Sequence, residues 1–303
     1  MLHIDGAVEA AAPDEGVAAH YGDPLREQRV MESAGALVDR SNRGVVTVAG
    51  PDRLSWLHSL TSQHLERLGP GESAQTLILS PQGHLEHHLT LTDDGTRVWA
   101  HVEPGTAAAL VSYLNSMRFM LRVEVEDVSD SYGVLSVIYG THQAPSPALP
   151  AFGSEAGAVA QVSGPFGIDL IVGAGQVADA VARAGSGGGT HAVAGMWAFE
   201  AARIAAGVPR PGMDTDHRTL PHEAGLIEPA VHLDKGCYRG QETVARVHNL
   251  GRPPRRLVLL HLDGVATDQP PAPGTPVSRR AYQGLSAYRP FMPVSVAAQV
   301  TAG

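Results

Sequence analysis

The spacing of apolar residues divides much of the chain into strands and helices. Residues 44–49 are apolar and β-branched, which predicts a strand. Pro51 then opens a predicted helix that runs to residue 68, with leucines at helical spacing. After a strand at 74–79, a turn at Pro81–Gly83 leads into a strand in which Leu85, His87, Leu89 and Leu91 share one face. The same patterns predict strands at 97–102, 119–125, 134–139, 168–172 and 257–262, and helices at 105–117, 176–184, 191–206 and 241–248.

Strands and helices alternate along the chain, but the strands often come as hairpins. This order predicts an α+β fold with mixed sheets. The segment 143–151 holds three prolines and is the clearest predicted linker. We therefore expect an N-terminal α+β lobe over residues 1–142, a second α+β lobe over 152–250 and a small C-terminal β domain over 251–303.

Charge and composition exclude several classes of protein. The chain has 22 basic and 31 acidic residues and a net charge of −9, which argues against a surface that binds nucleic acid directly. No apolar run approaches the roughly 20 residues that span a bilayer, so we expect no membrane attachment. The first sixteen residues have neither the basic start nor the apolar core of a signal peptide, and a single cysteine fits a reducing compartment. We expect a cytoplasmic protein.

The single cysteine, Cys237, lies in the densest run of chemistry in the sequence. Lys235 and Arg239 each lie two residues from it, and a helix is predicted just after it. Nearby cations and a helix N-terminus favour a thiolate, which is the design of a reactive thiol. The alternative is a buried cysteine that acts as a small hydrophobic residue. One cysteine cannot hold an iron–sulfur cluster by itself, so we expect no stably bound metal or cluster.

The run around Cys237 resembles the signature of the YgfZ family at every fixed position. Its residues are Lys235, Gly236, Cys237, Tyr238, Arg239, Gly240, Gln241 and Glu242. Flanking segments agree, because Arg203–Pro209, Leu220–Glu223 and Val48–Leu57 also resemble stretches of this family and of the related glycine-cleavage T-protein. The likeness extends from about residue 21 to residue 277.

The resemblance implies a multi-lobed, T-protein-like fold around a central channel that binds tetrahydrofolate or a derivative. It implies a role in the assembly or maintenance of iron–sulfur client proteins, including enzymes that modify tRNA. The catalytic group would be Cys237, with Lys235 and Arg239 beside it. The implied folate contacts are Phe199, where relatives carry a stacking aromatic, together with Trp197, Arg43 and Arg203.

The sequence departs from the T-protein at two acidic positions. The T-protein strand carries an acidic pair that serves aminomethyl transfer, and this chain has His87 and His88 there. A carboxylate near the folate would steer charge on the reacting nitrogen, so its loss argues against that activity. The family's glutamate before Ala-Gly is Ala205 here. Two alternatives therefore stay open: a folate-dependent aminomethyl or one-carbon transferase, and a non-catalytic scaffold that has lost folate.

From Ser278 onward the sequence no longer follows the Gly-punctuated strands of the family's C-terminal barrel. This predicts an atypical small β-barrel, incomplete through truncation or a shifted reading frame.

Other polar groups have simpler explanations beside functional ones. His84, Glu86 and His88 alternate on one strand face and suit a metal, although a solvated strand face explains them as well. Polar residues in the long loop after Pro211 suggest an acid–base site or ordinary loop polarity: Asp214, Asp216, His217, His222 and Glu223. Core packing is the default explanation for Phe199 and Trp197, and a surface position for Arg43.

Overall fold

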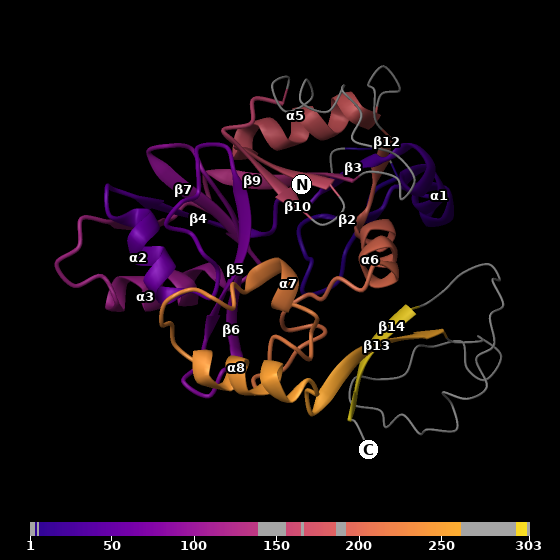
Figure 1. Cartoon of the computed structure of the whole chain (residues 1–303). Helices are drawn as coiled ribbons and strands as arrows, with labels where there is room; N and C mark the ends of the chain where they lie inside the picture. Colours follow the sequence, from indigo (N-terminus) through magenta and orange to yellow (C-terminus); the bar gives the residue numbers. More distant parts are fainter. Residues whose placement is uncertain are drawn as a thin grey trace.

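The computed structural model of the protein describes residues 4, 6–138, 156–164, 167–185, 192–261 and 295–301. Two five-stranded sheets form its centre (Figure 1). The first sheet is antiparallel throughout, in the order β5 (Ser73–Leu79), β6 (Leu85–Asp93), β7 (Arg97–Val102), β4 (Gly44–Ala49) and β8 (Glu124–Asp127). The second sheet is mixed, in the order β10 (Ala160–Gly164), β11 (Gly167–Gly173), β9 (Tyr132–Ile138), β3 (Ala36–Asp39) and β12 (Ala192–Ala194).

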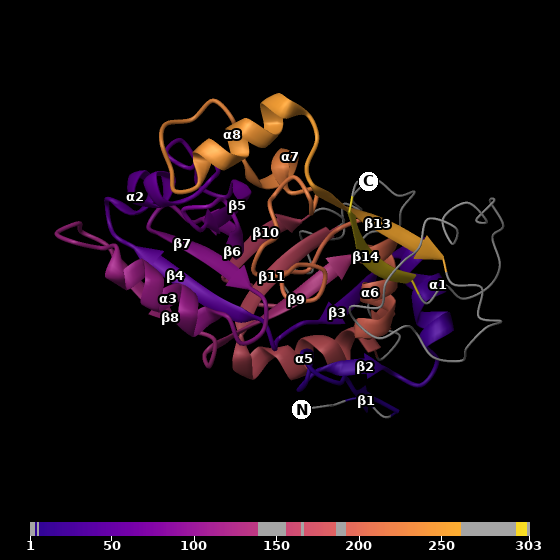
Figure 2. The ribbon, with the colours of Figure 1, turned by 90° about the horizontal axis from the view of Figure 1, so that it is seen from below.

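Helices pack against both faces of the two sheets. Their bounds are α1 (Pro24–Ala34), α2 (Arg53–Leu60), α3 (Ala107–Ser116), α5 (Ala174–Gly185), α6 (Met196–Ala205), α7 (Ile227–Ala230) and α8 (Gln241–Leu250). Two short sheets complete the described chain, β1 (Val8–Glu9) with β2 (Ala18–His20) and β13 (Arg255–His261) with β14 (Ser295–Thr301). Figure 2 shows α3 and α5 on one side of the sheets and α7 and α8 on the other. The α+β class with mixed sheets is confirmed.

Alternation along the strands divides the apolar residues between an outer and an inner core. On β4, Val46 and Val48 face α2 and α3, whereas Val45 faces the second sheet. On β9, Leu135 and Val137 pack against α5, whereas Val134 faces the first sheet. The inner core between the sheets is thus apolar near Val45, Trp99 and Val134. Since successive strand residues point to opposite faces, both faces of these strands are buried.

The second sheet draws strands from both sides of the predicted linker. Strands β3 and β9 precede residue 142, and β10, β11 and β12 follow residue 155. A boundary at this point therefore does not separate the two sheets. The linker itself, residues 143–151, lies outside the described residues, as does the segment from Ser278 to Pro293.

Three predicted elements have different bounds in the structure. The helix predicted to reach residue 68 ends at Leu60, because Thr61 is extended and the Lys235 ammonium binds carbonyls at that end. The helix predicted from 191 starts only at Met196, and the residues before it form β12, which pairs in parallel with β3. The strand predicted at 119–125 begins at Glu124, after a turn in which Phe119 has φ of 46°.

The YgfZ-like segment packs on the first sheet. Tyr238 and Val244 share a buried cluster with Leu77, Leu79 and Leu85 of β5 and β6. In the same region Gly240 has φ of 82°, and a Cβ there would lie 2.5 Å from the carbonyl oxygen of Ser80. Glycine is therefore required at this position for its left-handed backbone and for the close approach of two backbones.

This packing predicts the effect of adding one methyl group. Gly240→Ala should lower the free energy of unfolding by about 2–4 kcal/mol, because a strained φ adds to a steric clash. Gly207→Ala is the matched control, since Gly207 also has positive φ but has no atom within 4 Å of its virtual Cβ. It should cost only the backbone penalty of about 1–2 kcal/mol. Equal losses in chemical denaturation would contradict the packing argument.

Candidate functional site

A polar cleft lies between the inner faces of the two sheets. Its cavity volume is about 60 Å³, and the cleft is partly open to solvent. Its walls come from β5, β6, β7, β9, β10, β11 and α6, with the turn between β3 and β4 and the chain after α6. The lining residues are Arg40, Arg43, Gln75, His88, Thr90, His101, Glu103, Ile138, Gly164, Gly167, Asp169, Phe199, Arg203, Val208, Pro209 and Arg210.

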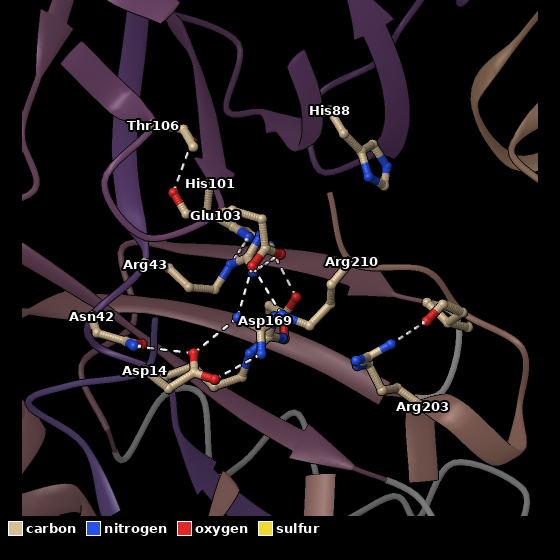
Figure 3. A network of polar contacts seen from close by, with 12 residues as sticks. Asp14, Asn42, Arg43, His88, His101, Glu103, Thr106, Asp169, Arg203 and Arg210 are labelled. Atoms are coloured by element: carbon tan, nitrogen blue, oxygen red, sulfur yellow. Dashed lines mark hydrogen bonds and ion pairs between the residues drawn. The ribbon is translucent and has the colours of Figure 1, made fainter. Parts of the chain in front are cut away.

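Glu103 is the centre of a buried ion-pair network on one wall of this cleft (Figure 3). Its carboxylate accepts hydrogen bonds from Arg43 Nη1 at 2.5 Å and from Arg210 Nη2 at 2.8 Å. Arg210 also binds both carboxylate oxygens of Asp14 at 2.8 Å and reaches Glu200 on α6 at 2.8 Å. One guanidinium therefore connects the N-terminal segment, the end of β7 and α6.

A second arm of the network starts at His101. Its Nδ1 accepts a hydrogen bond from Arg43 Nε at 2.9 Å, and its Nε2 lies 2.9 Å from Asp169 Oδ2. Asp169 accepts from Ser136 Oγ at 2.5 Å and pairs with Arg40 at 3.5 Å. His101 belongs to β7 and Asp169 to β11, so this arm joins the two sheets.

Electrostatics fix the protonation states in this network. Burial by itself raises the pKa of Glu103 and of Asp169. The guanidinium groups of Arg43 and Arg210 outweigh this effect at Glu103, and the contacts with His101, Arg40 and Ser136 outweigh it at Asp169, so both carboxyl pKa values lie well below the usual range. Burial lowers the pKa of His101, and it lowers the pKa of His88 to about 4. At neutral pH the acids are ionised and both imidazoles are neutral.

Three of the four predicted folate contacts line the cleft: Phe199, Arg43 and Arg203. Arg43 is buried and paired with Glu103, and Arg203 is buried and paired with Glu200 and Asp214. The Arg40 guanidinium lies 4.2 Å from the centroid of the Phe199 ring, so it covers part of this aromatic surface.

Trp197 lies outside the cleft. It is 56% exposed, and its ring centroid lies 4.9 Å from that of His20, with the two rings tilted by 49°. Residues 197 and 199 differ by about 200° around α6, so one helix cannot point both into the cleft. Ala205 is exposed as well and does not line the cleft.

The two histidines that replace the acidic pair have separate environments. His88 lines the cleft, and its Nε2 lies 2.9 Å from Gln75 Oε1. Because the amide oxygen accepts, Nε2 carries the proton and Nδ1 is the acceptor atom. His87 points to the opposite face of β6, where its ring lies 6.3 Å from that of Tyr113. Only His88 contributes chemistry to the cleft.

The remaining polar candidates are accounted for by other contacts. Glu86 pairs with Arg239, and His88 turns into the cleft, so these two do not join His84 in a group of potential metal ligands among the described residues. In the loop after Pro211, Asp214 accepts from Arg203, whereas Asp216 and Glu223 both pair with Arg255 of β13. These acids connect the loop to its neighbours.

Most of the YgfZ-like motif has a structural role. The Lys235 ammonium donates to the carbonyl oxygens of His58, Thr61 at 2.5 Å and Gln63 at 3.1 Å, which anchors the loop to the end of α2. Burial lowers the pKa of Lys235 to about 8. Gln241 Nε2 donates to the Lys235 carbonyl at 3.2 Å, and Tyr238 is in the core. Gly236 and Glu242 are exposed.

Cys237 is exposed and forms no disulfide, which rules out the buried, hydrophobic alternative. Its two predicted cationic neighbours have other partners, because Lys235 binds carbonyls and Arg239 pairs with Glu86 at 3.0 Å. Cys237 is not among the residues that line the cleft. The thiol and the cleft are therefore separate features, one on the surface and one between the sheets.

Sequence reasoning missed five cleft residues: Arg40, His101, Glu103, Asp169 and Arg210. One signal was available, because Asp169 is a lone acid inside the apolar run 168–172, and a buried charge requires a partner. The partners of Asp169, which are His101 on β7, Ser136 on β9 and Arg40 after β3, have no sequence signature.

Comparison with known proteins agrees with this architecture. The model of the GCVT N-terminal domain family matches residues 20–140. The glycine cleavage system aminomethyltransferase T from Bartonella henselae superposes with a TM-score of 0.68 at 20% identity, covering 84% of this chain and 74% of that one. The fold is T-protein-like.

Curated relatives of this T-protein-like chain have two kinds of name. A mitochondrial iron–sulfur cluster assembly factor IBA57 homolog of Mycosarcoma maydis is 27% identical over 244 residues, covering 76% of this chain and 58% of that protein. An aminomethyltransferase of Nostoc is 27% identical over 286 residues, covering 86% of this chain and 72% of that protein. A chloroplastic protein of Arabidopsis thaliana is 24% identical, and the chain covers 64% of its length. The chain thus spans less than two thirds of two of these relatives.

Within the described part of the chain, no helix is long and apolar enough to cross a membrane.

The neutral state of His88 predicts how stability depends on pH. Its pKa is about 4 in the folded protein and about 6.5 in an unfolded chain, so between these values the unfolded state binds more protons. Stability should therefore fall as pH drops from 6.5 to 4. His88→Gln should remove about 2–3 kcal/mol of this fall. The rest of the fall in stability should remain in this variant, because the pKa of His101 is also lowered in the folded protein.

Urea denaturation at several pH values checks this. His217→Gln, at an exposed loop position, is the control and should keep the wild-type slope. An unchanged slope in His88→Gln would show that His88 is protonated or solvated in the folded protein.

Proposed function

We propose that this T-protein-like chain is a folate-binding accessory protein of the YgfZ type. It supports the assembly or maintenance of iron–sulfur proteins, including enzymes that modify tRNA, and it acts through Cys237. One observation carries the proposal: Cys237 is exposed while Lys235, Tyr238, Gly240 and Gln241 hold its loop in place. A thiol on an anchored loop can reach a protein partner while its position stays defined.

The relatives support the iron–sulfur part of the proposal. The Mycosarcoma maydis homolog is named as an iron–sulfur cluster assembly factor. A single thiol supplies at most one ligand to a cluster that usually needs about four, so the client protein supplies the others. The net charge of −9 favours protein clients over RNA, and any effect on tRNA would come through the modifying enzyme. We place this function in the cytoplasm.

The cleft supports the folate part. It lies between the sheets and offers a neutral acceptor on His88, the amide of Gln75 and the hydroxyl of Thr90. The guanidinium groups of Arg43, Arg203 and Arg210 are already paired with carboxylates. We therefore expect the polar ring of a folate to bind near His88 and its glutamate tail to extend toward the mouth.

Aminomethyl transfer is the weaker alternative. A neutral imidazole at position 88 cannot supply the negative charge that a carboxylate would place beside a reacting nitrogen. The scaffold alternative, without folate, is separated from the proposal by a binding measurement.

In titration calorimetry, tetrahydrofolate should bind the purified protein with a Kd in the micromolar range, which corresponds to a binding free energy of about −8 kcal/mol. Cys237→Ser should bind equally well, because residue 237 does not line the cleft. Thr90→Trp, which fills the cleft from β6, should abolish binding. Absence of heat and of any thermal shift at millimolar tetrahydrofolate would leave only the scaffold alternative.

In cells, deletion of the gene should lower the activity of iron–sulfur enzymes, and Cys237→Ala should reproduce the deletion. Cys237→Ser should fail as well, because a serine hydroxyl is not ionised at neutral pH and is a poor ligand for iron. Asn249→Ala, exposed on α8 beyond the motif, is the control and should complement fully. Full restoration of aconitase-type and tRNA-thiolating activities by Cys237→Ser would refute the thiol mechanism without affecting the folate result.

A further inference from the structure

Three histidines and a glutamate gather beside the motif loop, outside the cleft. His58 lies in the last turn of α2, and His64 and Glu66 follow in the turns after this helix. One potential ligand atom from each of these three residues lies within 4.8 Å of the other two. The His58 and His64 rings are 4.6 Å apart, and the His232 ring lies 5.4 Å from that of His64.

The backbone around this cluster is held by hydrogen bonds that do not involve the imidazoles. The Lys235 ammonium binds the carbonyls of His58, Thr61 and Gln63 together. The His232 N–H donates to the Ser62 carbonyl at 2.9 Å, and Ser62 Oγ donates to the Ala230 carbonyl at 2.6 Å. Both views show the chain between α7 and α8 beside α2 (Figures 1 and 2). The cluster is therefore assembled by the fold.

The donor set suits a particular class of ion. Three imidazole nitrogens and one carboxylate oxygen favour a divalent transition metal over Mg²⁺ or Ca²⁺, which prefer oxygen ligands alone. Zinc bonds of about 2.0–2.2 Å in a tetrahedron put ligand atoms about 3.4 Å apart. The ligand atoms of His58, His64 and Glu66, which lie within 4.8 Å of one another, reach this spacing by side-chain rotation, because Glu66 is exposed and His64 is partly exposed. His232 is also exposed, and it reaches the same ion by rotation of its side chain toward His64.

One existing contact changes when an ion binds. The Leu65 N–H donates to His58 Nδ1 at 3.3 Å, beyond the common range for such bonds. Coordination through Nε2 moves the ring proton to Nδ1, so this weak contact is given up.

We propose that His58, His64, Glu66 and His232 form a binding site for a divalent transition-metal ion, with Zn²⁺ as the best match. The site contains no cysteine and shares no residue with the cleft, so it does not depend on folate binding. It also differs from the expectation of no bound metal, which rested on the cysteine count. Lys235 has a positioning role here, because it holds the turn that carries His58 and His64.

The test uses the full-length protein without a histidine tag. After treatment with a chelator, Zn²⁺ is titrated against a chromophoric competitor, and one equivalent per chain should bind to the wild type. The double variant His58→Ala/His64→Ala should lose more affinity than the roughly 10–100-fold that removal of an outer-shell partner costs. Co²⁺ should give the visible absorption of a tetrahedral ion in the wild type and not in this variant.

A matched control removes the same number of histidines elsewhere. His217 and His248 are exposed and lie outside the cluster. The double variant His217→Ala/His248→Ala should therefore bind Zn²⁺ like the wild type. His232→Gln and Glu66→Gln, tested singly, should each weaken binding and alter the Co²⁺ spectrum. Thermal unfolding in chelator, equal for all variants, separates loss of ligands from loss of fold.

Unchanged Zn²⁺ affinity in His58→Ala/His64→Ala would overturn the proposal. So would equal losses in both double variants, which would indicate scattered binding by surface histidines. Either result would leave the folate and thiol experiments unaffected.

Discussion

The pairing of Arg210 with Glu103 is the interaction on which the cleft depends. Glu103 follows β7, and Arg210 follows α6, so the contact joins the first sheet to the helix that packs on the second. Arg210 extends the connection to Asp14 in the N-terminal segment. Removing one partner of such a buried pair costs about 3–5 kcal/mol, because the other charge is left without compensation. The network therefore fixes the wall of the cleft more rigidly than apolar packing alone would.

The space between the sheets has two regions of different character. Where Val45, Trp99 and Val134 meet, it is a dry core. Farther along the same strands, His101, Ser136 and Asp169 occupy equivalent inward positions and form the polar wall. The acids and guanidinium groups of this wall are paired with each other, so their charges are balanced within the protein itself. His88 and Gln75, which also line the cleft, are neutral, and they are the groups that the proposed function assigns to the polar ring of the folate.

The YgfZ-like motif combines two tasks in eight residues. Its lysine, tyrosine, second glycine and glutamine fold the loop onto β5, β6 and the end of α2. Its cysteine is exposed on the surface of the loop that these contacts hold in place. A lysine whose ammonium is bound by three carbonyls stabilises the turn after α2, and the same turn brings His58 and His64 together. The proposed metal site and the thiol loop therefore depend on one anchor.

The sequence by itself determined the elements with strong periodicity and the chemistry of one loop. Strand 44–49, the hairpin around Gly83 and the helix at 241–248 could be predicted, because the side-chain periods of strands and helices are local properties. The single thiol in a glycine-containing loop was also visible, as was the likeness to the T-protein, whereas the exposure of that thiol was decided by the fold. The resemblance implied that Arg43 and Phe199 belong to one folate site; both residues line the cleft, and their contact with folate stays a prediction.

Only the tertiary structure decided the rest. It placed β3 and β9 in one sheet with strands that follow residue 155, shortened the helix after Pro51 and turned Trp197 to the surface. It also brought together Glu103, Asp169 and Arg210, and separately His58, His64 and His232. Long-range charge pairing leaves no period in the sequence, since each partner is chosen by the geometry of two sheets that meet face to face. A single sequence records which residues are charged, and the fold determines which of them meet.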